Sequence, residues 1–102
     1  MKSGLILVGI DDLPEVLRWV LEILDLWEDL GMALRLSQGK LSEIKSDNTT
    51  AKERMKGVLR AWLNKGGPGL APSWQNLSIA LRDKLVDRGK IAEAIEREVL
   101  TK

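Results

Sequence analysis

The sequence contains no cysteine and no histidine, and tryptophan is its only aromatic residue type. Without cysteine, the chain can form neither a disulfide framework nor a thiolate nucleophile, and this fits a reducing compartment such as the cytoplasm. Without histidine, a Ser-His-Asp triad and an ordinary zinc site are excluded as well. We therefore predict that the protein is not an enzyme and needs neither a metal nor a cofactor.

Two features that resemble catalytic motifs have simpler interpretations. Carboxylate pairs such as Asp11 and Asp12 fall at caps or on polar helix faces, and they have no partner residue for acid–base chemistry. The glycine-rich segment 66–69 lacks a following Gly-Lys-Ser/Thr and a preceding strand, so it predicts a turn and not a phosphate-binding loop. The apolar run 5–10 is too short to span a membrane, and we expect no membrane association.

The length and composition indicate one soluble globular domain. The 102 residues include 44% hydrophobic and 30% charged side chains, which is enough for a single core but not for two. We expect an extended lead-in over residues 1–11, because the glycines at positions 4 and 9 disfavour a helix, and a folded domain over residues 12–102.

The net charge of +1 conceals two segments of opposite sign. Residues 11–36 carry seven acidic side chains against two basic ones, a net charge of −5, whereas residues 52–65 carry five basic side chains against one acidic one, a net charge of +4. Solvated helix faces would explain this asymmetry. Alternatively, the two segments form complementary surfaces that attract copies of the chain or a related domain.

Apolar residues recur three and four positions apart along most of the domain, which is the period of a helix buried on one side. A first helix is expected to begin near Asp12, an N-cap with Glu15 three positions on and Pro14 in the first turn. Its buried stripe would consist of Leu13, Val16, Leu17, Val20, Leu21 and Leu24, with Trp19 and Ile23 on a neighbouring face.

Capping residues delimit the next three helices. The first of them is short, runs from Trp27 to about Arg35, and contains Gly31 as the mark of a close helix contact. Ser37 caps the following helix, because a serine hydroxyl accepts from a free N–H of the first turn. The polar loop after that helix supplies the cap of a long one, which ends near Lys65 before a loop rich in glycine and proline.

Two more helices follow that loop. Ser73 is the expected cap of one, whose buried stripe runs from Trp74 to Leu81 with Leu85 beside it, and the turn 87–89 separates it from the last helix. The pattern therefore predicts an all-α, antiparallel bundle of six helices. Its core is predicted to contain Trp27, Leu30, Leu41, Ile44, Leu59, Trp62, Trp74, Leu77, Leu81, Ile91 and Ile95.

The order and spacing of these residues resemble the death domain family over about residues 12–100. In the family's second helix a tryptophan is followed by leucine three positions on, a small residue four on, leucine seven on and a closing Leu-Ser pair. The corresponding residues here are Trp27, Leu30, Gly31, Leu34, Leu36 and Ser37. The later helices match through Leu41, Ile44, Leu59, Trp62, Leu63, Trp74, Leu77, Ala80, Leu81, Ile91, Ala92 and Ile95. The resemblance implies a death fold, which is a six-helix bundle of Greek-key type.

Three departures from the family pattern concern the connections between helices. Arg35 stands where the family usually has glycine before the Leu-Ser pair. The loop 66–72 is longer and richer in glycine and proline than usual. Ile91 follows Leu81 by about two residues more than the pattern requires, so the junction between the fifth and sixth helices should be extended.

The resemblance also implies a module that binds other death domains, of the same chain or a related one, in apoptotic or innate immune signalling. Family members associate through three asymmetric contacts and often form helical oligomers. The first contact joins helices 1 and 4 to helices 2 and 3. The second joins the end of helix 4 and its loop to the junction of helices 5 and 6, and the third joins helix 3 to the 1–2 and 3–4 turns.

The charge asymmetry suits the first of these contacts. There we expect the basic residues Lys52, Lys56 and Arg60 to face the acidic residues Glu28, Asp29 and Glu43 of another subunit. In the second contact, Lys65 and the exposed loop residue Leu70 are expected to pack against Asp87, Arg88 and Lys90. We accordingly expect a homo-oligomer or a helical assembly.

Two alternatives remain open from the sequence. The basic helix that carries Lys52, Arg54, Lys56 and Arg60 could enter a major groove of DNA, but a pI of about 8.0 and the acidic first helices oppose this, and we do not expect a nucleic-acid partner. A sister module such as a caspase-recruitment domain would be favoured instead by a kinked first helix.

Overall fold

The computed structural model describes residues 8–65 and 71–100. Within these ranges the α-helices are α1 (Leu13–Trp19), α2 (Trp27–Ala33), α3 (Gln38–Asp47), α4 (Ala51–Lys65), α5 (Trp74–Arg82) and α6 (Gly89–Ile95). Two 3₁₀ helices, η1 (Ile10–Asp12) and η2 (Leu21–Leu26), flank α1, and a π-helical segment, η3 (Glu96–Leu100), follows α6. The predicted all-α, six-helix class is therefore confirmed.

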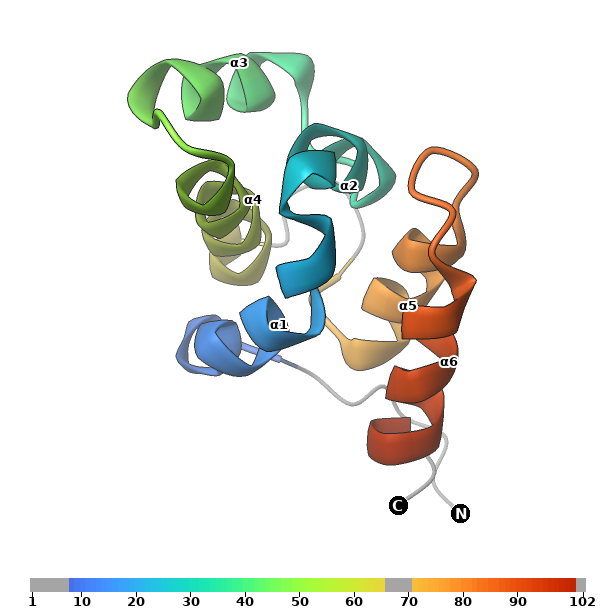
Figure 1. Ribbon diagram of the computed structural model, residues 1–102. Coiled ribbons are helices and arrows are strands. Elements are labelled where there is room, and N and C mark those ends of the chain that lie inside the picture. Colours follow the sequence, from blue (N-terminus) through green and yellow to red (C-terminus); the bar gives the residue numbers. More distant parts are fainter. Residues whose placement is uncertain (1–7, 66–70, 101–102) are drawn as a thin grey trace.

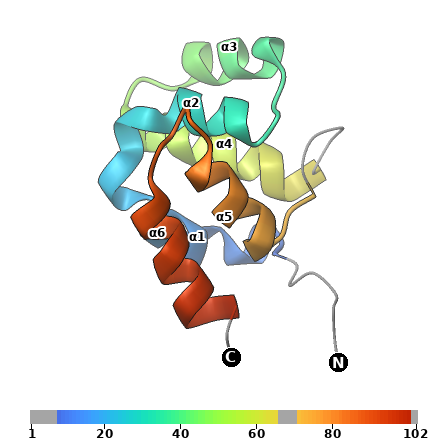
Figure 2. The same ribbon diagram turned by 90° about the vertical axis from the view of Figure 1, so that its right-hand side faces the viewer.

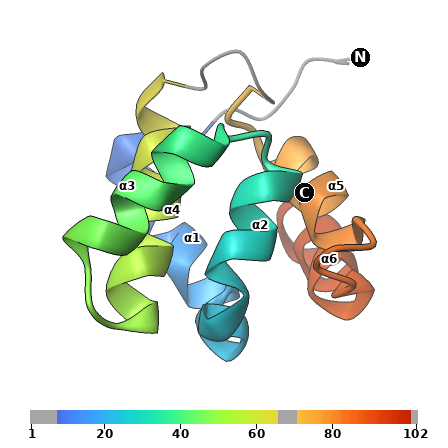
Figure 3. The same ribbon diagram turned by 90° about the horizontal axis from the view of Figure 1, so that it is seen from above.

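The helices lie in two groups with α2 between them, and α1 lies next to α4 (Figure 1). In the view from above, α3 and α4 are on one side of α2, and α5 and α6 are on the other (Figure 3). Figure 2 shows α5 and α6 packed along each other, and α5 also contacts α2. Because α4 contacts α1, α2 and α3, it connects α3 to the core.

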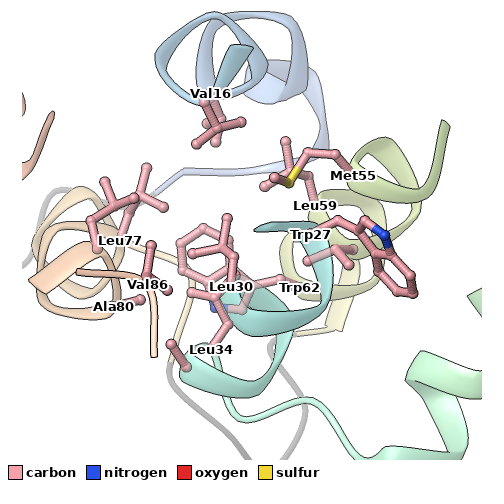
Figure 4. Packing of buried hydrophobic residues seen from close by; sticks show 14 of the residues in the cluster. Val16, Trp27, Leu30, Leu34, Met55, Leu59, Trp62, Leu77, Ala80 and Val86 are labelled. Carbon is pink, nitrogen blue, oxygen red and sulfur yellow. The ribbon is translucent and has the colours of Figure 1, made fainter. Parts of the chain in front are cut away.

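The core lies where α1, α2, α4 and α5 converge. Figure 4 shows their side chains gathered around Trp62, which is fully buried at 0% exposure. All residues predicted for the core are buried except Ile91, which is only partly buried and packs against the edge of the cluster. The tight packing of large side chains makes this cluster the main source of stability.

Three hydroxyl groups cap helices in the way that the sequence predicts. Ser37 Oγ accepts from the Lys40 N–H at 3.1 Å, and Ser73 Oγ accepts from the Asn76 N–H at 3.1 Å. Thr50, from the polar loop before α4, accepts from a first-turn N–H of that helix at 3.1 Å. Each bond satisfies a backbone donor that has no partner within its own helix.

The first helix is shorter than predicted. It ends at Trp19, Val20 leaves the helical conformation, and Ile23 has non-helical dihedrals of φ −127° and ψ 35°. As a result Val20 and Ile23 are buried, whereas Leu21, predicted on the buried stripe, is 46% exposed. The β-branched side chains of Val20 and Ile23 disfavour a helix. The free energy gained by burying them exceeds that of the backbone hydrogen bonds that a continuous helix would have kept.

Asp12 occupies the N-cap position of α1, as predicted, but its side chain does not cap that helix. Asp12 makes no side-chain bond to the first turn of α1, and its carboxylate instead accepts from the Gly9 N–H at 2.9 Å. This bond belongs to η1, which begins at Ile10, so the extended lead-in ends at Gly9. Val8 is buried, and its N–H donates to the Pro72 carbonyl at 3.2 Å. The rest of the predicted lead-in, residues 1–7, lies outside the described residues.

The turn from α2 to α3 is held by Gly31 and Arg35. A Cβ at Gly31 would lie 2.5 Å from Leu41 Cδ2, which confirms the close helix contact predicted at this glycine. Arg35 has φ 71°, its N–H donates to the Met32 carbonyl, and the Leu36 N–H donates to the Gly31 carbonyl. This is a Schellman motif, whose left-handed position favours glycine, so arginine is strained there.

In the segment after α5, the buried residue lies one position later in the sequence than predicted. Leu85, expected beside the buried stripe, is 49% exposed, whereas Val86 is 2% exposed and belongs to the core. The helix stops at Arg82, and the following turn reaches φ 52° at Asp87. Because the turn no longer follows the helical period, the side chain that points inward changes by one position.

Candidate protein-interaction surfaces

Three basic residues spaced four apart form a row along α4, which we call the basic row: Lys52, Lys56 and Arg60. Lys52 and Arg60 are exposed, and Lys56 is partly buried. None of the three forms an ion pair with a described residue. The row therefore presents positive charge that no ion pair with a described residue neutralises.

Two carboxylates, Glu28 and Asp29, lie in the first turn of α2, and we call them the acidic start of α2. Glu28 is exposed and Asp29 is partly buried. Carboxylates at this position stabilise a helix by interacting with its dipole. In the described part of the chain neither carboxylate forms an ion pair, so both can also receive a cationic side chain from a partner.

Glu43, which the sequence groups with Glu28 and Asp29, has different surroundings. Its Oε1 accepts from Lys40 Nζ at 3.0 Å. It also lines a hollow of about 350 Å³ between α3 and α4, and Arg60 lines the same hollow. Glu43 and Arg60, predicted to face each other across two subunits, thus border one hollow within a single chain.

The junction of α5 and α6 forms a separate polar surface. Asp87, Arg88 and Lys90 are exposed and line a hollow of about 610 Å³ together with Glu22 and Ile91. Ile91, predicted for the core, is therefore a wall of this hollow. The other half of the predicted contact, the side chain of Lys65 and Leu70, lies outside the described residues.

Arg54 shows that one basic residue of α4 supports the fold. Its guanidinium lies 5.6 Å from the centre of the Trp27 ring. It also donates to two carbonyls at the end of α3, from Nε to Asn48 at 2.9 Å and from a terminal nitrogen to Lys45 at 3.1 Å. Sequence reasoning missed this role, because it depends on where α3 ends relative to α2 and α4. It also removes Arg54 from the surface needed by a DNA-binding helix.

A second structural cluster joins η3 to α5. The buried Ser78 donates to Glu96 Oε2 at 2.5 Å, and Arg82 donates to both oxygens of that carboxylate, at 3.2 and 2.8 Å. The Arg82 bonds, and then the Ser78 bond, hold the pKa of Glu96 below its ordinary value. Glu96 in turn raises the pKa of Arg82. The sequence offers no local signal for a cluster that spans two helices.

The family model of the death domain matches residues 14–99, which covers most of the chain. The chain belongs to the death domain family. No curated protein and no solved structure matches it. Death domains are non-catalytic modules that bind other death domains in signalling, and the family match supports this role for the chain.

The break after Trp19 is the feature that would favour a caspase-recruitment domain, but the matched family is the death domain. Within residues 8–65 and 71–100 there is no cluster of three or more potential metal ligands. No helix among the described residues is long and apolar enough to cross a membrane.

Proposed function

We propose that this death domain assembles with copies of itself through a contact between the basic row of α4 and the acidic start of α2. The observation that carries the proposal is the absence of ion pairs to described residues at Lys52, Lys56, Glu28 and Asp29. Opposite charges left unpaired on two different surfaces steer subunits into one orientation. Each exposed pair contributes only about 0.2–1 kcal/mol, so several pairs must act together.

A contact between two different surfaces has a consequence for the size of the assembly. Such a head-to-tail contact does not close on a two-fold axis, so subunits can keep adding to form a helical oligomer. We propose that the α5–α6 junction, with Asp87, Arg88 and Lys90, meets Lys65 and Leu70 of the next subunit as a second contact. On the family resemblance, we place this assembly in cytoplasmic apoptotic or innate immune signalling, where related death domains are additional candidate partners.

The proposal can be tested by size-exclusion chromatography with light scattering, over a range of protein and salt concentrations. We expect assembly that weakens as salt increases, because salt screens exposed charges. The double variant Lys52→Glu with Lys56→Glu should assemble far more weakly than the parent, because it loses the first of the two contacts. A matched control, Lys52→Arg with Lys56→Arg, keeps both charges and should assemble as the parent does.

Charge-reversal rescue makes the test specific for this contact. A second chain with Glu28→Lys and Asp29→Lys should restore mixed assembly with the Lys52→Glu, Lys56→Glu chain. Thermal melts of each variant establish that the domain still folds, since lysines in the first turn of α2 oppose its helix dipole. Assembly that persists undiminished in the reversed chain, or that strengthens at high salt, would show that the charge pairing between α4 and α2 does not hold the subunits together.

A further inference from the structure

The hollow between α3 and α4 is balanced in charge within one chain. Among its lining residues, Lys40 and Arg60 are cationic and Glu43 and Asp47 are anionic. A partner that approaches this hollow meets no net charge, whereas a partner that approaches the acidic start of α2 meets two carboxylates. Balanced charges give little long-range steering. The acidic surface expected on α2 and α3 is therefore restricted to α2.

Lys40 is the residue that neutralises the carboxylate of Glu43. Its Nζ lies 3.0 Å from Glu43 Oε1, and the two side chains are 48% and 60% exposed. The residues are three positions apart on α3, a spacing that brings side chains together on a helix. Both side chains can be reached from solvent, so the pair can exchange for a pair with another subunit.

Within α3, the ion pair with Glu43 is the stabilising contact that the Lys40 side chain makes with a described residue. It lies in the first turn of the helix, where the dipole disfavours a cation. Its backbone N–H bond to Ser37 does not require a lysine side chain. Removing the side chain therefore leaves the cap intact, and the loss of the exposed ion pair is offset by relief of an unfavourable interaction with the dipole.

We infer that Lys40 limits assembly by keeping Glu43 from the basic row of a second copy of the chain. The inference rests on the proposed function, because it requires that the basic row of one subunit docks beside α2 and α3 of the next. When Lys40 is removed, Glu43 keeps no ion pair to a described residue, and its carboxylate becomes one more partner for Lys52 or Lys56 of the second copy. Lys40 thus weakens contacts between copies that use α3.

The test compares Lys40→Ala with Lys45→Ala by sedimentation equilibrium of the purified chain at low salt. Both variants remove one exposed lysine from α3, but Lys45 forms no ion pair with a described residue. We expect Lys40→Ala to raise the association constant about 1.4- to fivefold relative to Lys45→Ala, the range that one exposed ion pair supplies. Thermal melts should show both variants folded.

Adding Glu43→Gln tests whether the carboxylate of Glu43 causes the stronger association. In the Lys40→Ala background this change should abolish the gain, whereas in the parent chain it should change the association constant little. Equal association of Lys40→Ala and Lys45→Ala, or a gain that survives Glu43→Gln, would overturn the inference while leaving the proposed function standing. A parent chain that stays monomeric at every salt and protein concentration would overturn the proposed function, and the inference with it.

Discussion

The two sides of α4 carry similar cationic residues that have different roles. Arg54 stacks on Trp27 and donates to two carbonyls at the end of α3, so its charge is used inside the domain. Lys52 and Lys56 have no ion pair within the described chain. The comparison teaches that positive charge in a sequence does not by itself mark a binding surface. The surface consists of those charges that the fold leaves without a partner.

The largest effect is expected from replacing a residue on the buried side of α4. Trp62→Ala removes a fully buried indole, and we expect a loss of about 3–5 kcal/mol in the free energy of unfolding, or a failure to fold. Lys52→Ala on the exposed side should change stability by less than about 0.5 kcal/mol. Chemical denaturation measures both changes. A melt of Trp62→Ala close to that of the parent would contradict the placement of the core.

A second prediction tests the structural role of Arg54. Arg54→Ala should lower stability by about 1–2 kcal/mol, because it removes two charge-assisted hydrogen bonds and the contact with Trp27. Lys56→Ala, two positions further along α4, is the control and should be nearly neutral. If both variants unfold at the same denaturant concentration, then Arg54 and Lys56 are equally peripheral to the fold.

A third prediction concerns strain at the end of α2. Arg35 has φ 71°, a conformation that costs a non-glycine residue roughly 1–2 kcal/mol. Arg35→Gly should therefore raise the free energy of unfolding, by about 0.5–1 kcal/mol after allowance for the greater freedom of glycine in the unfolded chain. Arg35→Ala is the control, since alanine keeps the strain and should not stabilise. If glycine destabilises the domain, then the arginine side chain makes a contact whose loss costs more free energy than the relief of backbone strain returns.

Features with a strong local signal, such as the helix caps, were predicted from the sequence, whereas several features set by distant residues were not. The caps at Ser37 and Ser73 depend on a hydroxyl and the next turn, so the local pattern was sufficient. The break after Trp19 depends on which side of the chain the core covers. The pairing of Glu43 with Lys40 was within reach, because its three-residue spacing is visible in the sequence. The hollow that Glu43 shares with Arg60 was not.

The smallest expected effect is a pH dependence at the cluster that joins η3 to α5. Arg82 and Ser78 hold the pKa of Glu96 below its ordinary value of 4.5. A carboxylate whose pKa is lower in the folded than in the unfolded chain stabilises the fold above the unfolded value. That contribution is lost as the pH falls through the folded pKa. The difference in melting temperature between the parent and Glu96→Gln should therefore be largest near pH 7 and should close well below pH 4.5.

The control for this last prediction is Glu98→Gln, an exposed residue of the same segment that makes no ion pair with a described residue. It removes the same charge from η3 without touching Arg82 or Ser78. Its melting temperature should follow that of the parent at every pH, apart from a small constant offset. Because the Arg82–Glu96 pair is exposed to solvent, salt should reduce the effect of Glu96→Gln as well. A gap that stays constant down to pH 3 would show that the glutamate contributes by packing and not by its charge.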